Sequence, residues 1–167
     1  TEWGEYIEHD KGSYWRAMKG RDLEKTAPKI QKIPAEEVLH FYVGTDMIPM
    51  QRAEVALIHS IRKTASKPSY IEWMDESRDN HDVWKGWNNK RWYTKFSNFR
   101  WAIPERRNFK GRAVYLDVDQ IILKDPKELF ELPIPEGKAW LSLDKTRTDV
   151  MVFDCSKFDE SFWPSIE

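Results

Sequence analysis

Cysteine is almost missing from this chain of 167 residues, and long apolar runs and an excess of charge of one sign are missing altogether. The one cysteine, Cys155, excludes an internal disulfide and a cysteine-rich zinc site, so any metal would be held by oxygen and nitrogen ligands. No apolar stretch approaches the roughly 20 residues that span a bilayer, and the first residues lack the pattern of a signal peptide. We therefore expect a cytoplasmic protein without a transmembrane segment.

Charge and apolar content define the class of protein further. Lys and Arg number 27 against 28 Asp and Glu, so the net charge is −1 and no overall field attracts polyanions. Any binding of phosphate must be local. With 40% hydrophobic and 14% aromatic residues, the chain has enough apolar material for one ordered core.

The pattern of residue types changes near residue 37. Residues 1–37 mix aromatic and charged residues without a period, and we interpret them as an N-terminal arm or helical extension, with a helix between Ser13 and Glu24. Residues 38–167 form the second, main domain. Its first part predicts a strand at Val38–Val43, a helix at Pro49–Thr64 and a strand at Ser69–Met74, which is a βαβ unit.

The second half of the chain continues this α/β pattern. Aromatic spacing predicts a helix over Trp92–Ala102 that ends before Pro104. Apolar runs predict strands at Arg112–Leu116, Ala139–Leu143 and Val150–Phe153. The fold class is therefore α/β.

Two acids interrupt an apolar ladder directly after the strand that ends at Leu116. Asp117 and Asp119 lie at i and i+2, so on extended backbone both carboxylates point the same way, and the apolar run resumes at Ile121–Leu123. Such a pair at the carboxyl edge of a sheet suits Mg²⁺ or Mn²⁺. The alternative interpretation is that the two acids are ordinary turn residues after a strand. Farther on, Asp125 is predicted to cap a short helix that has proline at its first position.

The segment Ala113–Asp125, with the sequence AVYLDVDQIILKD, resembles the DxD signature of GT-A-fold glycosyltransferases. It is most similar to the glycogenin and bacterial galactosyltransferase family, glycosyltransferase family 8, and the resemblance extends from about Val38 to Phe158. It implies a Rossmann-like three-layer sandwich with a mainly parallel sheet. It also implies that Mn²⁺, or Mg²⁺, holds a nucleoside diphosphate sugar, preferably a UDP-sugar, whose sugar is transferred with retention to a carbohydrate, lipid or protein acceptor.

The resemblance assigns roles to particular residues. Asp119 resembles the principal metal ligand, Asp117 a ligand that also meets the ribose, and Val118 lies between them in the donor site. Val43, Thr45 and Asp46 are candidate nucleotide contacts; a helix cap is the alternative for Asp46.

Two more residues follow from the same resemblance. Lys95 matches a basic residue that faces the donor phosphate, and a solvated lysine is the alternative. Asp144 matches a carboxylate near the transferred sugar and is the candidate catalytic residue, with a turn acid as the alternative.

The chain also departs from the family. Where the family has Asn, a small residue and Gly, this sequence has Arg147-Thr148-Asp149, in which Asp149 could substitute as a polar group. The family's third metal ligand is a histidine farther along, and none of the histidines here matches it: His9, His40, His59 and His81. The domain could therefore be minimal or truncated, with hydrolysis of the donor beside transfer.

Two other functions remain open at this stage. From Trp84 to Arg112 nine Lys or Arg face one acid, Glu105, among aromatic residues, a pattern that also suits single-stranded nucleic acid. The run Leu116–Asp119 also resembles the nucleophile strand of haloacid-dehalogenase-type phosphatases, although Gln120 follows where Gly or Thr is usual. A dinucleotide-binding site is excluded because no G-x-G-x-x-G follows the first strand.

Overall fold

The computed structural model divides the chain into two units, Thr1–Val38 and Leu39–Glu167. It describes residues 3–7, 30–34, 37–75, 92, 94, 96–159 and 161. The predicted boundary, between residues 37 and 38, falls one residue before this division.

The first unit contains a pair of strands that the sequence analysis did not expect. β1 (Trp3–Ile7) and β2 (Ile30–Pro34) pair antiparallel. Both strands contain aromatic or β-branched residues, which favour extended backbone. The helix predicted between Ser13 and Glu24 lies outside the described residues.

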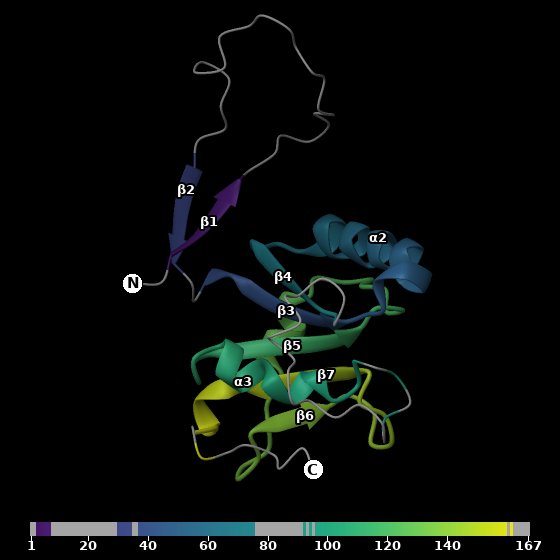
Figure 1. Ribbon diagram of the computed structural model, residues 1–167. Helices are drawn as coiled ribbons and strands as arrows, with labels where there is room; N and C mark the ends of the chain where they lie inside the picture. Colours follow the sequence, from purple (N-terminus) through teal and green to yellow (C-terminus); the bar gives the residue numbers. More distant parts are fainter. Residues whose placement is uncertain are drawn as a thin grey trace, which may run out of the picture. The chain divides into compact units, whose positions relative to one another are not determined.

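The second unit is built on a five-stranded sheet with the order β4-β3-β5-β7-β6 (Figure 1). β3 pairs parallel with β4 and β5, whereas β7 pairs antiparallel with β5 and β6. Four strands therefore run one way and β7 runs the other, in a mostly parallel sheet. The strands are β3 (Leu39–Gly44), β4 (Ser69–Met74), β5 (Arg112–Asp117), β6 (Trp140–Ser142) and β7 (Val150–Asp154).

Helices cover both faces of this sheet. The long helix α2 (Met47–Thr64) connects β3 to β4 and packs on one face together with the short helix α4 (Lys127–Glu131). The 3-10 helix η2 (Phe99–Ala102) and α3 (Ile103–Arg106) pack on the other face, near the 3-10 helix η3 (Cys155–Lys157). The mixed α/β class is therefore confirmed, and the predicted βαβ unit is present: β4 has the predicted bounds, β3 is shifted by one residue, and α2 starts two residues earlier than predicted.

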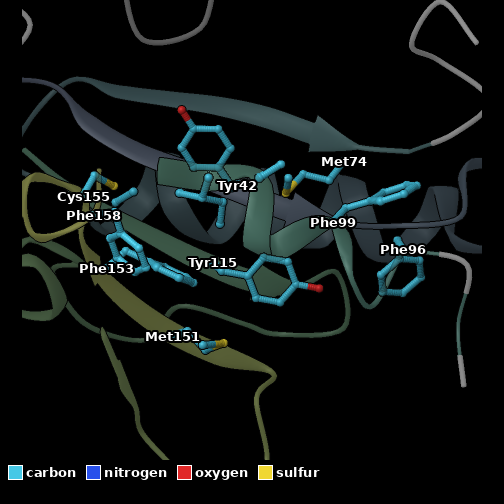
Figure 2. Packing of buried hydrophobic residues seen from close by; sticks show 12 residues of the cluster. Tyr42, Met74, Phe96, Phe99, Tyr115, Met151, Phe153, Cys155 and Phe158 are labelled. Atoms are coloured by element: carbon cyan, nitrogen blue, oxygen red, sulfur yellow. The ribbon is translucent and has the colours of Figure 1, made fainter. Parts of the chain in front are cut away.

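The central strands are largely apolar because both faces of the sheet are covered. Val114 and Leu116 of β5 face α2, whereas Tyr115 between them faces η2 and α3. Successive side chains of a strand point to opposite faces, so a strand covered on both sides is apolar throughout. Figure 2 shows the core on the η2 and α3 side of the sheet, the aromatic cluster, in which Tyr42 and Tyr115 lie among the aromatic side chains of η2 and β7.

The predicted helix over Trp92–Ala102 is wrong. Residues 96–98 form turns, η2 starts only at Phe99, and α3 continues through Pro104 instead of stopping before it. Proline stands in the first turn of α3, where its missing N–H has no intrahelical partner to lose.

The predicted continuation of the β5 ladder is also wrong. Residues 121–123 are not in a strand, and the backbone N–H of Ile122 donates to Ser60 Oγ on α2, at 3.0 Å. A side chain of α2 thus takes the place of a neighbouring strand. α4 begins at Lys127, one residue later than predicted, yet Asp125 Oδ1 still accepts from the Lys127 N–H at 3.0 Å.

Cys155 lies fully buried beside β7, and burial raises the pKa of its thiol to about 12. At about pH 8 the thiolate fraction is then about a thousandfold below that of an ordinary cysteine. We expect native protein to resist iodoacetamide and to react with one equivalent in denaturant, as mass spectrometry would measure. Rapid modification of the native chain would contradict the buried position.

Among the described residues, no helix combines the length and apolar character needed to cross a membrane.

Candidate functional site

The ends of β3 and β5 meet at one edge of the sheet. Gly44, the last residue of β3, is opposite Asp117, the last residue of β5. The Asp117 N–H donates to the Asp149 carbonyl at 2.8 Å, and the Val118 N–H donates to the Gly44 carbonyl at 3.1 Å. Because β7 runs opposite to β5, Asp149, just before β7, lies at the same edge. This edge is the carboxyl edge of the parallel strands, where α/β proteins bind ligands.

Asp117 is held by two side chains from the protein interior. The Tyr115 hydroxyl donates to Asp117 Oδ1 at 2.6 Å, and Arg100 Nη2 lies 3.7 Å from the same oxygen. Burial raises the pKa of the Asp117 carboxyl above its ordinary value, the Tyr115 hydrogen bond and Arg100 lower it, and Asp119 and Asp149 raise it. The negative charges of Asp119 and Asp149 therefore act on Asp117.

Arg100 is a residue of this site that the sequence analysis counted only as one basic residue among nine. It is 4% exposed, its Nε donates to the Ser97 carbonyl at 2.6 Å, and its Nη1 donates to the Thr148 carbonyl. Its guanidinium also lies 4.4 Å from the centre of the Tyr115 ring, a cation–π geometry. Arg100 lies within η2, and its place in the sequence gave no sign of its contacts with Tyr115, Asp117 and Thr148, which come from distant segments.

Asp119 extends from the edge toward solvent. Gln120 Nε2 donates to Asp119 Oδ1 at 3.0 Å and lies 3.5 Å from Asp149 Oδ2, so one amide connects the two acids. Arg147 forms an ion pair with Asp149 at 3.1 Å. Gln120 was not predicted as a site residue, although its place directly after the DxD pair is a signal that could have suggested it.

The end of β3 and the turn after it contain the predicted nucleotide contacts. The Val43 side chain is fully buried against α2, and Thr45 Oγ1 donates to the buried Glu54 of α2 at 2.6 Å. Asp46 is half-buried and starts α2 without a side-chain capping bond, although its carbonyl accepts from the Met50 N–H at 3.2 Å. These three residues reach the same edge as the acids, and their contact with a nucleotide remains a prediction.

The other predicted site residues have different surroundings. Val118 is buried in the cluster under α2, so its side chain faces the core. Asp144 is exposed after β6, where the backbone N–H and hydroxyl of Thr146 both donate to its Oδ1 at 2.7 Å and lower its pKa. Lys95 lies outside the described residues. Asp75, directly after β4, is a further buried acid that was not predicted as a site residue.

Whether a cation fits this edge depends on which side-chain atoms could coordinate it. Within the described part of the chain, no three His, Cys, Asp or Glu side chains gather as a ready-made metal centre. Asp117 and Asp119 nevertheless supply hard carboxylate oxygens, and Asp149 adds negative charge beside them. Mg²⁺ is commonly held by one or two carboxylates together with water and substrate phosphates, so the pair fits such an ion.

Comparison with known proteins supports the fold. No protein-family model and no curated protein matches the sequence. A solved structure of "WbbM bifunctional glycosyltransferase", in its apo form, is similar with a TM-score of 0.50 and 15% identity over 74% of this chain. The matched part is 32% of that protein, about a third of its length. At this identity the likeness shows a shared fold, and that fold occurs in a glycosyltransferase.

Proposed function

We propose that this chain is a metal-dependent glycosyltransferase of the GT-A type that binds a nucleoside diphosphate sugar, with a UDP-sugar favoured. One observation supports it above all: Asp117 ends a buried strand, and Asp119 follows in the next turn, at the carboxyl edge of a sheet whose fold is shared with a glycosyltransferase. Membership of the glycogenin and bacterial galactosyltransferase family is part of the proposal. It rests on the resemblance of the segment Ala113–Asp125 to that family's DxD signature.

In this proposal Asp117 and Asp119 hold Mn²⁺ or Mg²⁺ through their carboxylate oxygens. When bound, the cation would offset the negative charge that grows on the diphosphate leaving group as the glycosidic bond breaks. The half-buried Asp117 gives a fixed ligand, whereas the exposed Asp119 can turn toward an entering substrate. Two protein ligands leave coordination positions for phosphate oxygens and water.

The remaining predicted residues would serve the two ends of the donor. Val43 near the end of β3, and Thr45 and Asp46 directly after it, lie at the same edge as the acids, so these residues would bind the nucleoside. Lys95 would face the diphosphate, and Asp144 would orient the sugar or the acceptor hydroxyl. The acceptor is a carbohydrate, lipid or protein, and retention at the anomeric carbon follows from the resemblance.

A thermal-shift screen of the full chain tests this function. UDP, GDP, UDP-glucose and UDP-galactose are each measured with Mn²⁺ and with EDTA. A nucleotide at about 100 times its Kd stabilises the folded state by about 2.7 kcal/mol. We expect an upward shift of the melting temperature with one nucleotide and Mn²⁺ together, and none with EDTA.

Two further assays, and the EDTA arm of the screen, test the alternative functions. Hydrolysis of p-nitrophenyl phosphate without nucleotide binding would favour a phosphatase. A salt-sensitive gel shift with single-stranded DNA would favour nucleic-acid binding. Nucleotide binding that is equally strong in EDTA would contradict the metal-dependent site.

A further inference from the structure

We propose that Tyr115 is a positioning residue for Asp117: it fixes one carboxylate oxygen, Oδ1, and thereby presents the other, Oδ2, to the cation. This inference rests on the proposed function, because it assigns a partner to one of the proposed metal ligands. The inference goes beyond the proposed function because it gives a role to a core tyrosine outside the DxD pair.

The hydroxyl of Tyr115 is well placed for this role. Tyr115 and Asp117 lie at i and i+2 on β5, so their side chains project from the same face of the strand. The ring is fully buried in the aromatic cluster, and its hydroxyl donates to Asp117 Oδ1 at 2.6 Å. Figure 2 shows the hydroxyl directed along the sheet toward Phe96. A short hydrogen bond to a carboxylate from a ring that cannot move defines the carboxylate's orientation.

Two neighbours lock the ring in place. Gly44 on the adjacent strand leaves the space that the hydroxyl occupies, since a Cβ there would overlap Tyr115 Oη. Arg100 lies over the ring, 4.4 Å from its centre, and lies 3.7 Å from the same Asp117 oxygen. Both side-chain contacts of this carboxylate therefore go to Oδ1. A cation would bind through Oδ2, and Asp117 would be a monodentate ligand.

Tyr115 would affect metal affinity through the orientation of the Asp117 carboxylate. Side chains that orient a metal ligand through a hydrogen bond typically change metal affinity 10–100-fold when they are removed. The neutral tyrosine adds no positive charge to repel the cation, so its removal acts on the direction and mobility of the carboxylate. Arg100 is positively charged, and a test of its geometry must keep that charge.

The experiment compares two tyrosines of the same core. Tyr115→Phe removes the hydroxyl that Asp117 accepts, and Tyr42→Phe removes one from the residue opposite Tyr115 in the register, which is also buried. Mn²⁺ affinity of the full chain is measured by electron paramagnetic resonance of the free ion, with and without UDP. We expect Tyr115→Phe to weaken Mn²⁺ binding about tenfold or more, and Tyr42→Phe to stay within about twofold of wild type.

The outcomes separate this inference from the proposed function. Wild-type Mn²⁺ affinity in Tyr115→Phe, or an equal loss in Tyr42→Phe, would overturn the positioning role and leave the function standing. Failure of the wild-type chain to bind Mn²⁺ would overturn both. Should Tyr115→Phe not fold, as thermal unfolding would show, Arg100→Lys keeps the charge and loses the guanidinium geometry. A similar loss of Mn²⁺ affinity is then expected, and wild-type affinity would overturn the inference.

Discussion

Asp119→Asn is expected to lower metal-dependent turnover of a nucleotide sugar by about a thousandfold or more while the fold stays intact. The amide keeps the shape of the carboxylate but removes the negative charge that a divalent ion requires. A metal ion supplies several kcal/mol of stabilisation to a developing charge, and each 1.36 kcal/mol changes a rate tenfold. Release of UDP in the presence of Mn²⁺ measures the effect, and calorimetry measures the accompanying loss of nucleotide affinity.

The exposed position of Asp119 makes this variant a clean test, because little packing depends on it. Glu136→Gln is the matched control, since Glu136 is another exposed acid and lies in the loop before β6. It should leave turnover unchanged. Equal turnover in Asp119→Asn and wild type would remove Asp119 from the metal site.

Gly44→Ala is expected to destabilise the second unit by about 3 kcal/mol, which corresponds to roughly 6–12 °C in melting temperature for a chain of this size. A Cβ at this position would overlap Tyr115 Oη and lie 2.5 Å from Phe96 Cδ2. Both neighbours are buried in the aromatic cluster, so neither can move away freely. Urea unfolding followed by tryptophan fluorescence measures the loss.

Two further variants separate overpacking from backbone effects. Gly137→Ala places a Cβ in open space but at a φ of +70°, so it should cost only about 1 kcal/mol. Combining Gly44→Ala with Tyr115→Phe removes the nearest atom and should restore part of the stability, whereas Phe96 still opposes the new methyl group. A stability of Gly44→Ala equal to that of wild type would show that β3 and β5 pack more loosely at this edge.

The strands and the long helix were predictable because their patterns are local. β3, β5 and β7 each appear as a short apolar run, and burial on both faces explains why these runs do not alternate with polar residues. The spacing of apolar residues identified α2 in the same way. The errors at residues 92–102 and 121–123 have different causes. Spacing alone identifies a helix only when its turns are regular, and residues 96–102 form turns and a 3-10 helix. Ile122 hydrogen-bonds to a side chain of α2, which no local pattern reveals.

The candidate site was predictable only in part. Asp117 and Asp119 could be identified because they stand at the end of an apolar strand. The expected common direction of the two carboxylates is wrong in its premise of extended backbone, because β5 ends at Asp117 and residues 118–119 form a turn in which the Gln120 N–H donates to the Asp117 carbonyl at 3.2 Å. The partners of Asp117 were not identified, because Arg100 belongs to η2 and Asp149 directly precedes β7, and both are far from Asp117 in the sequence. Glu54 likewise meets Thr45 only because α2 folds back over β3.

The sequence by itself determined the α/β class, the strand that ends in two acids and the absence of any internal disulfide, since each depends on residue type and on periods of a few residues. Only the tertiary structure decided which groups surround those acids. Tyr115, Gly44 and Arg100 become neighbours of Asp117 through strand pairing and through packing of η2 on the sheet. These contacts join residues far apart in the chain, and their geometry depends on how the layers of the sheet and helices close on one another.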